Sequence, residues 1–343
     1  MIIHSHWQGQ PTLLIDTPLA RCEISLQGAQ VLSFIPKAEG RDLLWCSAAR
    51  LQSGRPVRGG IPICWPWFSR QGRPAHSVQH GFARQLRWTL ESINENAATV
   101  HEPSSAVVAG ALSAQATSTS QIRSLATSTS QTNSLVTSTS QTTSIAKNLS
   151  AGSVQVCMSL NAPGGAWPEA DWPAGCEASV VVEIGSALTV RLITRNHSEQ
   201  TIVLTQALHT YLSVGDVTHA ALSGLRGKTY LDNLQGLQRF TQDSEWRFGT
   251  GSQPACDRIY LATKSEHLLT DPVLDRRISI RSSGSASTVV WNAGPQGILA
   301  LGDVPAQAWP GYLCVEAANC LPEDAVTLAP GARTELAQTL AAL

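Results

Sequence analysis

Hydrophobic and polar residues alternate with a period of two along several short stretches of the chain. Leu and Val at the even positions of 188–192 alternate with Thr and Arg at the odd positions, and a similar alternation runs from 202 to 209. Because successive side chains of a strand point to opposite faces of a sheet, this pattern predicts β-strands. Shorter strands are predicted at 278–280, 288–291 and 326–328, the last of them before a Pro-Gly turn.

The sequence has no convincing long amphipathic helix. Many short strands separated by Gly, Pro, Asn and Asp turns are typical of an all-β protein, and at this size they favour a large β-sandwich. A chain of 343 residues is long enough for one large all-β domain or for two average domains, and length alone does not decide between them.

A tandem repeat interrupts this pattern. Residues 116–125, 126–135 and 136–145 each carry Thr-Ser-Thr-Ser-Gln at the same place, and between 103 and 150 the charged residues are Arg123 and Lys147, with no aromatic residue. Such a composition gives little to bury, so it predicts an inserted surface loop, disordered or loosely β; a β-solenoid is the alternative, for which three short copies are few. Since a long loop closes at modest entropic cost, one β-sandwich domain over 1–343, interrupted by an insertion at 103–150, is predicted.

The global composition sets limits on partners and location. Charged residues make up 14% of the chain and the formal net charge is -1, which points to neither a nucleic-acid nor a membrane partner. The sequence has no apolar run of about 18 residues and no basic-then-apolar start, so a cytoplasmic location is expected. Its eight cysteines include no C-x-x-C pair, so neither a zinc ribbon nor a redox motif is indicated.

The segment from Ser47 to Leu90 contains no acidic residue but seven arginines: Arg50, Arg55, Arg58, Arg70, Arg73, Arg84 and Arg87. It also holds Arg-Gly-Gly-Ile-Pro at 58–62 and Gln-His-Gly-Phe-Ala-Arg at 79–84, with Trp-Pro-Trp-Phe between them. Arginines offer planar forks to phosphate oxygens, glycines let a backbone approach a ligand, and tryptophans can pack on a sugar ring. The alternative is a solvated arginine-rich loop. A nucleic-acid patch is less favoured, because Lys is scarce and the aromatics are bunched with prolines.

Two ionisable residues belong to apolar segments, His209 at the end of one and Glu316 within another. His209 follows Ala207-Leu208 and should project on the face opposite Leu208, where a structural histidine is the more common case. Glu316 lies within Cys-Val-Glu-Ala-Ala-Asn at 314–319, and a carboxylate buried there is costly enough to suggest a function, with a salt bridge to an arginine as the alternative.

Two further candidates have simple explanations. Asp257 opens Asp-Arg-Ile-Tyr, where capping or an ion pair to Arg258 would account for it. His76 and His80 are four residues apart, but the flanking Pro74 and Gly81 disfavour a helix and no third ligand is apparent, so no metal site is predicted.

Five segments in this order carry a family resemblance: Arg-Gly-Gly-Ile-Pro-Ile-Cys-Trp-Pro at 58–66, His-Gly-Phe-Ala-Arg at 80–84, Ala-Leu-His-Thr-Tyr at 207–211, Asp-Arg-Ile-Tyr at 257–260 and Cys-Val-Glu-Ala-Ala-Asn at 314–319. Together they resemble the glucose-6-phosphate 1-epimerase (hexose-6-phosphate mutarotase) family, over nearly the whole chain except the repeats. The resemblance implies a galactose-mutarotase-like β-supersandwich in a single domain.

The resemblance also implies roles for six residues and no cofactor. His209 and Glu316 correspond to the family's catalytic acid and base, and the substrate-binding positions fall on Arg58, Gln79, Arg84 and Asp257. The expected reaction interconverts the α and β anomers of a hexose 6-phosphate by opening and reclosing the ring. Two alternatives stay open at this stage: a mutarotase for unphosphorylated aldoses, and a non-catalytic β-sandwich that binds sugar phosphates. The oligomeric state is left open.

Overall fold

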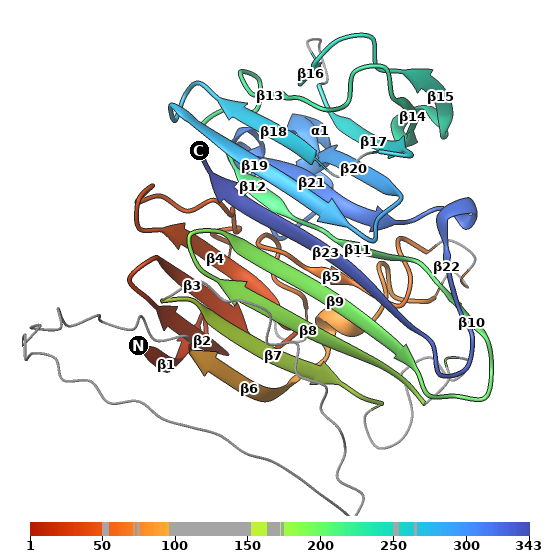
Figure 1. The fold of residues 1–343 in the computed structure, drawn as a ribbon. Helices are drawn as coiled ribbons and strands as arrows, with labels where there is room; N and C mark the ends of the chain where they lie inside the picture. The colour runs from red at the N-terminus through yellow and green to blue at the C-terminus, as the bar shows by residue number, and fades with distance from the viewer. Residues whose placement is uncertain are drawn as a thin grey trace, which may run out of the picture. The chain divides into compact units, whose positions relative to one another are not determined.

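The alternating segments form antiparallel sheets (Figure 1). The computed structural model describes residues 1–49, 55–70, 73, 76–95, 152–162, 172, 175–249, 254–263 and 266–343. The predicted insertion at 103–150 lies outside the described residues, and so does Arg50. Residues 1–97 and 149–343 belong to one compact unit.

Two large sheets dominate this unit. The nine-stranded sheet has the order β16 (Trp246–Arg247), β13 (Ala221–Leu222), β18 (Glu266–Asp271), β19 (Arg276–Ser283), β23 (Arg333–Ala342), β9 (Leu188–Asn196), β8 (Cys176–Ile184), β7 (Val154–Leu160) and β6 (Thr89–Glu95). The eight-stranded sheet has the order β15 (Gln238–Thr241), β14 (Thr229–Asp232), β17 (Cys256–Leu261), β20 (Ser287–Asn292), β21 (Tyr312–Asn319), β11 (Gln206–Leu208) and β5 (Ile63–Cys64), with β12 (Tyr211–Ser213) also paired to β21.

The remaining described strands form two smaller sheets. The N-terminal segment forms a four-stranded meander of β1 (Ile2–Trp7), β2 (Gln10–Asp16), β3 (Ala20–Ser25) and β4 (Gln30–Pro36), and β10 (Ile202–Leu204) pairs with β22 (Val326–Leu328). Among the described residues the one α-helix, α1 (Gly294–Gly297), has four residues, and no helix there is long and apolar enough to cross a membrane. The all-β prediction is therefore confirmed.

The main core lies between the two large sheets. Leu192 and Leu336 of the nine-stranded sheet belong to the same buried cluster as Leu208 and Val315 of the eight-stranded sheet. Burying each such side chain contributes about 1.5–3 kcal/mol. Gln338 of β23 also bridges the two sheets, because its side chain accepts from the hydroxyl of Thr210 and donates to the carbonyl of Val315.

The predicted strand at 202–209 is divided between two sheets. β10 pairs with β22, whereas β11 pairs with β21 and β5. The break falls at Thr205, whose backbone N–H donates to the Pro66 carbonyl and whose hydroxyl accepts from the Phe68 N–H. The alternation correctly predicts strands here, but periodicity within one segment does not determine which partner strand each half pairs with. The other predicted strands lie within β9, β19, β20 and β22.

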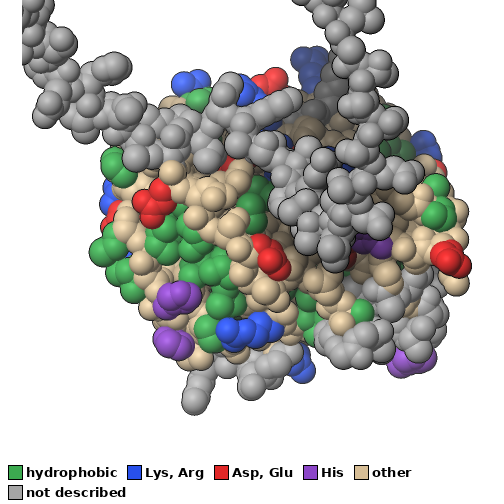
Figure 2. Space-filling model, turned by 60° about the horizontal axis from the view of Figure 1, so that its bottom comes forward, with side chains coloured by type: hydrophobic (Ala, Val, Ile, Leu, Met, Phe, Trp, Pro, Cys, Tyr) green, Lys and Arg blue, Asp and Glu red, His purple; other side chains and the backbone are tan. Residues whose placement is uncertain are grey.

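Charged side chains are scattered on the described part of the face in Figure 2, with both signs interspersed. This distribution agrees with the low charge content of the chain. All eight cysteines are described and none is in a disulfide.

Candidate active site

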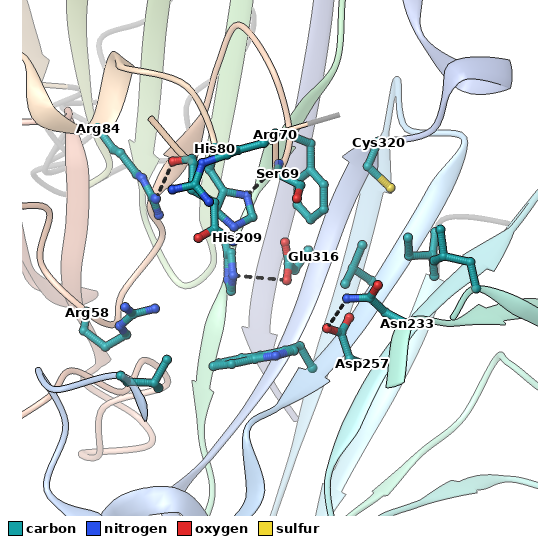
Figure 3. Close-up of a pocket in the computed structure, with 17 residues that line it drawn as sticks. Arg58, Ser69, Arg70, His80, Arg84, His209, Asn233, Asp257, Glu316 and Cys320 are labelled. Carbon is teal, nitrogen blue, oxygen red and sulfur yellow. Dashed lines mark hydrogen bonds and ion pairs between the residues drawn. The ribbon is translucent and has the colours of Figure 1, made fainter. Parts of the chain in front are cut away.

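A cavity of about 390 Å³ opens on the face of the eight-stranded sheet that is turned away from the main core. Its volume falls in the range of small-molecule sites, roughly 300–1,000 Å³. All six residues singled out from the sequence line it: Arg58, Gln79, Arg84, His209, Asp257 and Glu316. The fold therefore gathers residues that are up to 258 positions apart in the sequence, from Arg58 to Glu316, into one site (Figure 3).

Strand register brings His209 and Glu316 together. Leu208 pairs with Ala317 in β11–β21, and Tyr211 pairs with Cys314 in β12–β21. The two pairings share one register, which places His209 opposite Glu316 of β21. The His209 N–H donates to the Pro62 carbonyl at 3.0 Å and continues the pairing of β11 with β5.

The same register builds the floor of the cavity. Glu316 pairs with Val289 of β20, which pairs in turn with Ile259 of β17. Trp291 and Asp257 pair with each other two residues further along the same two strands. Because residues i and i+2 of a strand share a face, all of these side chains point to the cavity side of the sheet.

The imidazole and the carboxyl group meet in a buried environment. His209 Nε2 lies 3.4 Å from Glu316 Oε1, and the side chains are 9% and 1% exposed. This distance is long for a hydrogen bond. His209 Nδ1 and Glu316 Oε2 have no hydrogen-bond partner among the described residues. The alternative salt bridge from Glu316 to an arginine is not present in the described part of the chain. Unsatisfied polar atoms buried beside a cavity are groups that a bound molecule can satisfy.

Burial pushes both groups toward their neutral forms. It raises the pKa of Glu316 well above its ordinary value, an effect to which the charge of Asp257 adds and which the charge of Arg84 opposes. Burial, followed by the charges of Arg84 and Arg58, lowers the pKa of His209 to about 3. Perturbed acid and base groups that face each other in a cavity are characteristic of proton-transfer sites.

Aromatic rings hold the imidazole in place. The His209 ring stacks on Tyr211 with centroids 4.9 Å apart and an angle of 9°, and its edge-on contacts are with Trp291 and His80. Tyr211 is buried and its hydroxyl accepts a hydrogen bond from Arg58 at 3.4 Å. The ring of His209 is therefore fixed, and proton transfer need not wait for it to reorient.

The arginines that line the cavity differ in their partners. Arg58 forms a salt bridge with Asp303, 3.1 Å from NH2 to Oδ2, and its Nε lies 3.1 and 3.2 Å from the two carboxylate oxygens. Arg84 donates from Nη2 to the Gln79 carbonyl at 2.7 Å, and its Nε has no hydrogen-bond partner in the part of the chain that the structure describes. Among the described residues no carboxylate lies within ion-pair distance of Arg84. Its charge is therefore available to an anionic ligand.

The opposite side of the cavity carries acceptors and amide groups (Figure 3). Asp257 Oδ2 accepts from Asn233 Nδ2 at 2.8 Å. Burial raises the pKa of Asp257 above its ordinary value. The alternative explanation for Asp257, an ion pair with Arg258, does not hold, because Arg258 pairs with Asp232 at 3.6 Å. Pairing with Arg258 therefore does not explain why the Asp257 carboxylate lies at the cavity.

Two expectations about the arginine-rich segment are wrong in detail. Gly60 and Gly81 do not bring the backbone close to a ligand; a Cβ at these positions would lie 2.1 Å from the Val31 carbonyl oxygen and 2.0 Å from that of Trp65. Both have positive φ angles, so they allow tight backbone packing that places Arg58 and His80. Trp65 and Trp67 are buried in the core and do not line the cavity.

Several further residues line the cavity although the sequence motifs assign them no individual role. The cavity is also lined by Phe68, Ser69, Arg70, His80, Asn233 and Trp291, among others. Trp291 and Phe68, rather than the core tryptophans, supply the aromatic surface. His80 belongs to the His-Gly-Phe-Ala-Arg motif at 80–84, but neither this motif nor its spacing from His76 assigns it a role in the site. Its place between two motif residues, Gln79 and Arg84, was the signal available in the sequence. Asn233 and Trp291 lay in segments without a motif.

Comparison with known proteins agrees with this architecture. The family model described as aldose 1-epimerase matches residues 11–109 and 139–341. The Escherichia coli (strain K12) protein named "Putative glucose-6-phosphate 1-epimerase" is 27% identical over 328 residues, covering 92% of this chain and 85% of the relative.

Solved structures show the same fold. The crystal structure of a "putative mutarotase" from Salmonella typhimurium aligns with a TM-score of 0.75 at 23% identity, covering 99% of this chain and 93% of that one. A "galactose mutarotase-like protein" from Clostridium acetobutylicum aligns with a TM-score of 0.64 at 11% identity, covering 100% and 98% of the two chains. The chain has the galactose-mutarotase-like fold, as the resemblance implied.

Proposed function

This chain belongs to the aldose 1-epimerase family, and we propose that the sugar whose anomers it interconverts is a hexose 6-phosphate. The family membership makes it an isomerase that acts on a small sugar. The proposal adds the phosphate group and the roles of individual residues. The alternative of a non-catalytic sugar-phosphate-binding protein is set aside by the family.

The proposed reaction uses one base and one acid. Glu316 removes the proton of the C1 hydroxyl, the C1–O5 bond breaks as the C1 carbonyl forms, and His209 protonates the departing ring oxygen. After rotation about C1–C2, the ring oxygen attacks the other face of the aldehyde, and the two residues return their protons in exchanged roles. Electrons and protons balance over the cycle, so the chemistry requires neither a cofactor nor a metal ion.

The working form of the pair has the proton on His209. Burial favours the neutral pair, with the proton on Glu316. One proton transfer across the 3.4 Å contact produces the imidazolium and the carboxylate. The charge of Arg58 opposes this transfer, because it lowers the pKa of His209, whereas the charge of Arg84 lowers the pKa of both His209 and Glu316 and so acts on both sides of the transfer. A bound phosphate would offset the charge of Arg58 and make protonation of His209 easier. Substrate binding would thereby favour the reactive form of the pair, in which His209 is protonated and Glu316 is a carboxylate.

The proposed binding contacts hold the sugar phosphate away from C1 and leave C1 free to react. Arg84 and Arg58 hold the phosphate, with Gln79 at the same side of the cavity, while Asp257 accepts hydrogen bonds from ring hydroxyls on the opposite side. The open-chain aldehyde must rotate before it recloses, so a firm hold on the far end of the sugar keeps it in place during the rotation.

One observation carries the phosphate proposal. Arg84 lines the cavity that contains the His209–Glu316 pair, yet it has no carboxylate partner in the described part of the chain. A guanidinium left unpaired beside a sugar site is costly unless a ligand supplies the anion. The names of the sequence relatives, such as that of the Escherichia coli protein, point in the same direction.

The test is a direct measurement of anomer exchange. Exchange spectroscopy by NMR on glucose 6-phosphate and on glucose gives the rate for each substrate with the wild-type protein, Arg84→Gln and Glu316→Gln. We expect the wild type to prefer glucose 6-phosphate and Arg84→Gln to lose most of that preference. Equal kcat/KM for the two sugars in the wild type would leave a mutarotase for unphosphorylated aldoses as the function. Full activity of Glu316→Gln would exclude Glu316 as the base.

A further inference from the structure

Three guanidinium groups line the cavity, and their surroundings separate them. Arg58 is paired with Asp303, whereas Arg84 and Arg70 have no carboxylate within ion-pair distance among the described residues. Arg70 is the residue of the three for which no role followed from the sequence resemblance. A phosphate dianion carries more charge than one guanidinium neutralises, and bidentate arginine contacts are well suited to its oxygens.

The Arg70 side chain is held at the cavity although it is exposed. Its Nε donates to the Ser77 carbonyl at 2.8 Å, which leaves both terminal nitrogens for other partners. The neighbouring backbone is also tied down, because the Ser69 N–H donates to His80 Nδ1 at 3.1 Å and the His80 N–H donates to the Ser69 carbonyl at 2.7 Å. Three hydrogen bonds therefore connect residues 69–70 with residues 77–80, so little side-chain freedom of Arg70 remains to be lost on binding.

Arg70 and Arg84 act on the same part of the cavity. Burial holds the pKa of His80 well below its ordinary value, and the charges of Arg84, His209, Arg58 and Arg70 lower it further. Figure 3 shows Arg70, His80 and Arg84 together on one side of the cavity, with Asp257 and Asn233 on the other. An anion bound on the arginine side would therefore experience the charges of both arginines.

We propose that Arg70 is a specificity-determining residue that binds the phosphate of the substrate together with Arg84. This inference rests on the proposed hexose 6-phosphate substrate. Ser69 also lines the cavity, next to Arg70 in Figure 3, and its hydroxyl is a further candidate to donate a hydrogen bond to the phosphate. The phosphate group is remote from C1 and keeps its charge throughout ring opening. Its contact with Arg70 is equally strong in the ground state and in the transition state, so it affects KM and leaves kcat nearly unchanged.

The experiment compares Arg70→Gln with a matched control. Arg87→Gln removes the same charge from the same arginine-rich segment, but Arg87 does not line the cavity. Anomer exchange is measured for glucose 6-phosphate and glucose at fixed ionic strength. For Arg70→Gln we expect KM for glucose 6-phosphate to rise about 5- to 20-fold, near the lower end of the effect of losing one charge-assisted hydrogen bond, because Arg70 is exposed. The ratio of kcat/KM for the two sugars should fall by the same factor, and Arg70→Lys should recover part of it.

The outcomes separate the two proposals. If Arg84→Gln lowers the preference for glucose 6-phosphate while Arg70→Gln behaves like Arg87→Gln, the inference about Arg70 is wrong and the proposed substrate stands. If the wild type has no preference for glucose 6-phosphate, the proposed substrate itself is wrong. A fall in kcat for Arg70→Gln on both sugars would also overturn the inference, since it would indicate a structural effect on the catalytic pair.

Discussion

The buried histidine of the active site should make folding stability depend on pH in a way that one substitution removes. In the folded protein the pKa of His209 lies at about 3, against an ordinary value of 6.5. Replacing His209 by glutamine removes the titrating group and keeps a polar side chain in its place. The difference in unfolding free energy between the two proteins should therefore change between pH 7 and pH 5.

The magnitude follows from proton linkage. A histidine whose folded pKa is depressed binds protons in the unfolded state first, so its contribution to stability is lost as pH falls from about 6.5 toward 3. At pH 5, which is about 1.5 pH units below the ordinary pKa of 6.5, the histidine is protonated in the unfolded state, and this protonation lowers the free energy of that state. The folded state is almost unprotonated at pH 5, because its pKa is about 3. At 1.36 kcal/mol per unit the stabilisation of the unfolded state is about 2 kcal/mol, whereas at pH 7 it is only about 0.2 kcal/mol. The histidine is 9% exposed, so screening by solvent takes little from this value.

The assay is urea unfolding followed by tryptophan fluorescence at pH 7 and pH 5. All other ionisable groups are the same in both proteins, so their contributions cancel to first order in the difference. We expect His209→Gln to gain about 2 kcal/mol relative to the wild type on going from pH 7 to pH 5. Arg87→Gln is the control, because arginine keeps its charge over this range and the difference should not change with pH. A constant difference for His209→Gln as well would refute a depressed pKa at His209 and the neutral resting pair.

Three further predictions concern single residues. Glu316→Gln should lower kcat for anomer exchange by about 10²- to 10⁴-fold, the usual contribution of a general base, with little change in KM. Gly81→Ala should destabilise the fold by about 2–4 kcal/mol in urea unfolding, since its Cβ would meet the Trp65 carbonyl at a positive φ angle. Asp303→Asn should lower KM for glucose 6-phosphate about threefold, the effect of freeing Arg58 from a partly exposed ion pair.

Each of these has an outcome that would contradict it. Glu316→Gln with wild-type kcat would show that another group takes the C1 proton. For Gly81→Ala the comparison is Gly9→Ala, which has a similar φ angle but nothing within 4 Å of the new Cβ. Equal losses for the two variants would mean that the close approach to Trp65 carries no cost. A higher KM in Asp303→Asn would indicate that the carboxylate positions Arg58 rather than neutralising it.

The sequence by itself determined the class of fold. The alternation at 188–192 and at 278–280 identifies strands because the side-chain period of a strand is local, and both segments lie in strands β9 and β19. The same local rule placed His209 on the face opposite Leu208. It failed at 202–209, where one continuous alternation serves two sheets, because the choice of partner strand depends on residues far away in the chain.

The six candidate residues also came from the sequence, but through ordered motifs and not through geometry. That they line one cavity depends on register: His209 faces Glu316 because β11 and β12 keep one pairing with β21. The protonation state of the pair follows from burial, which no local pattern measures.

The tertiary structure alone decided the differences among the arginines. In the sequence, Arg58, Arg70 and Arg84 are equivalent members of one acid-free segment. In the fold, Asp303 arrives from a distant segment to pair with Arg58, and hydrogen bonds to Ser77 and Gln79 orient the other two toward the cavity. Composition counts charges, but the availability of a charge to a ligand depends on which partners the fold brings to it.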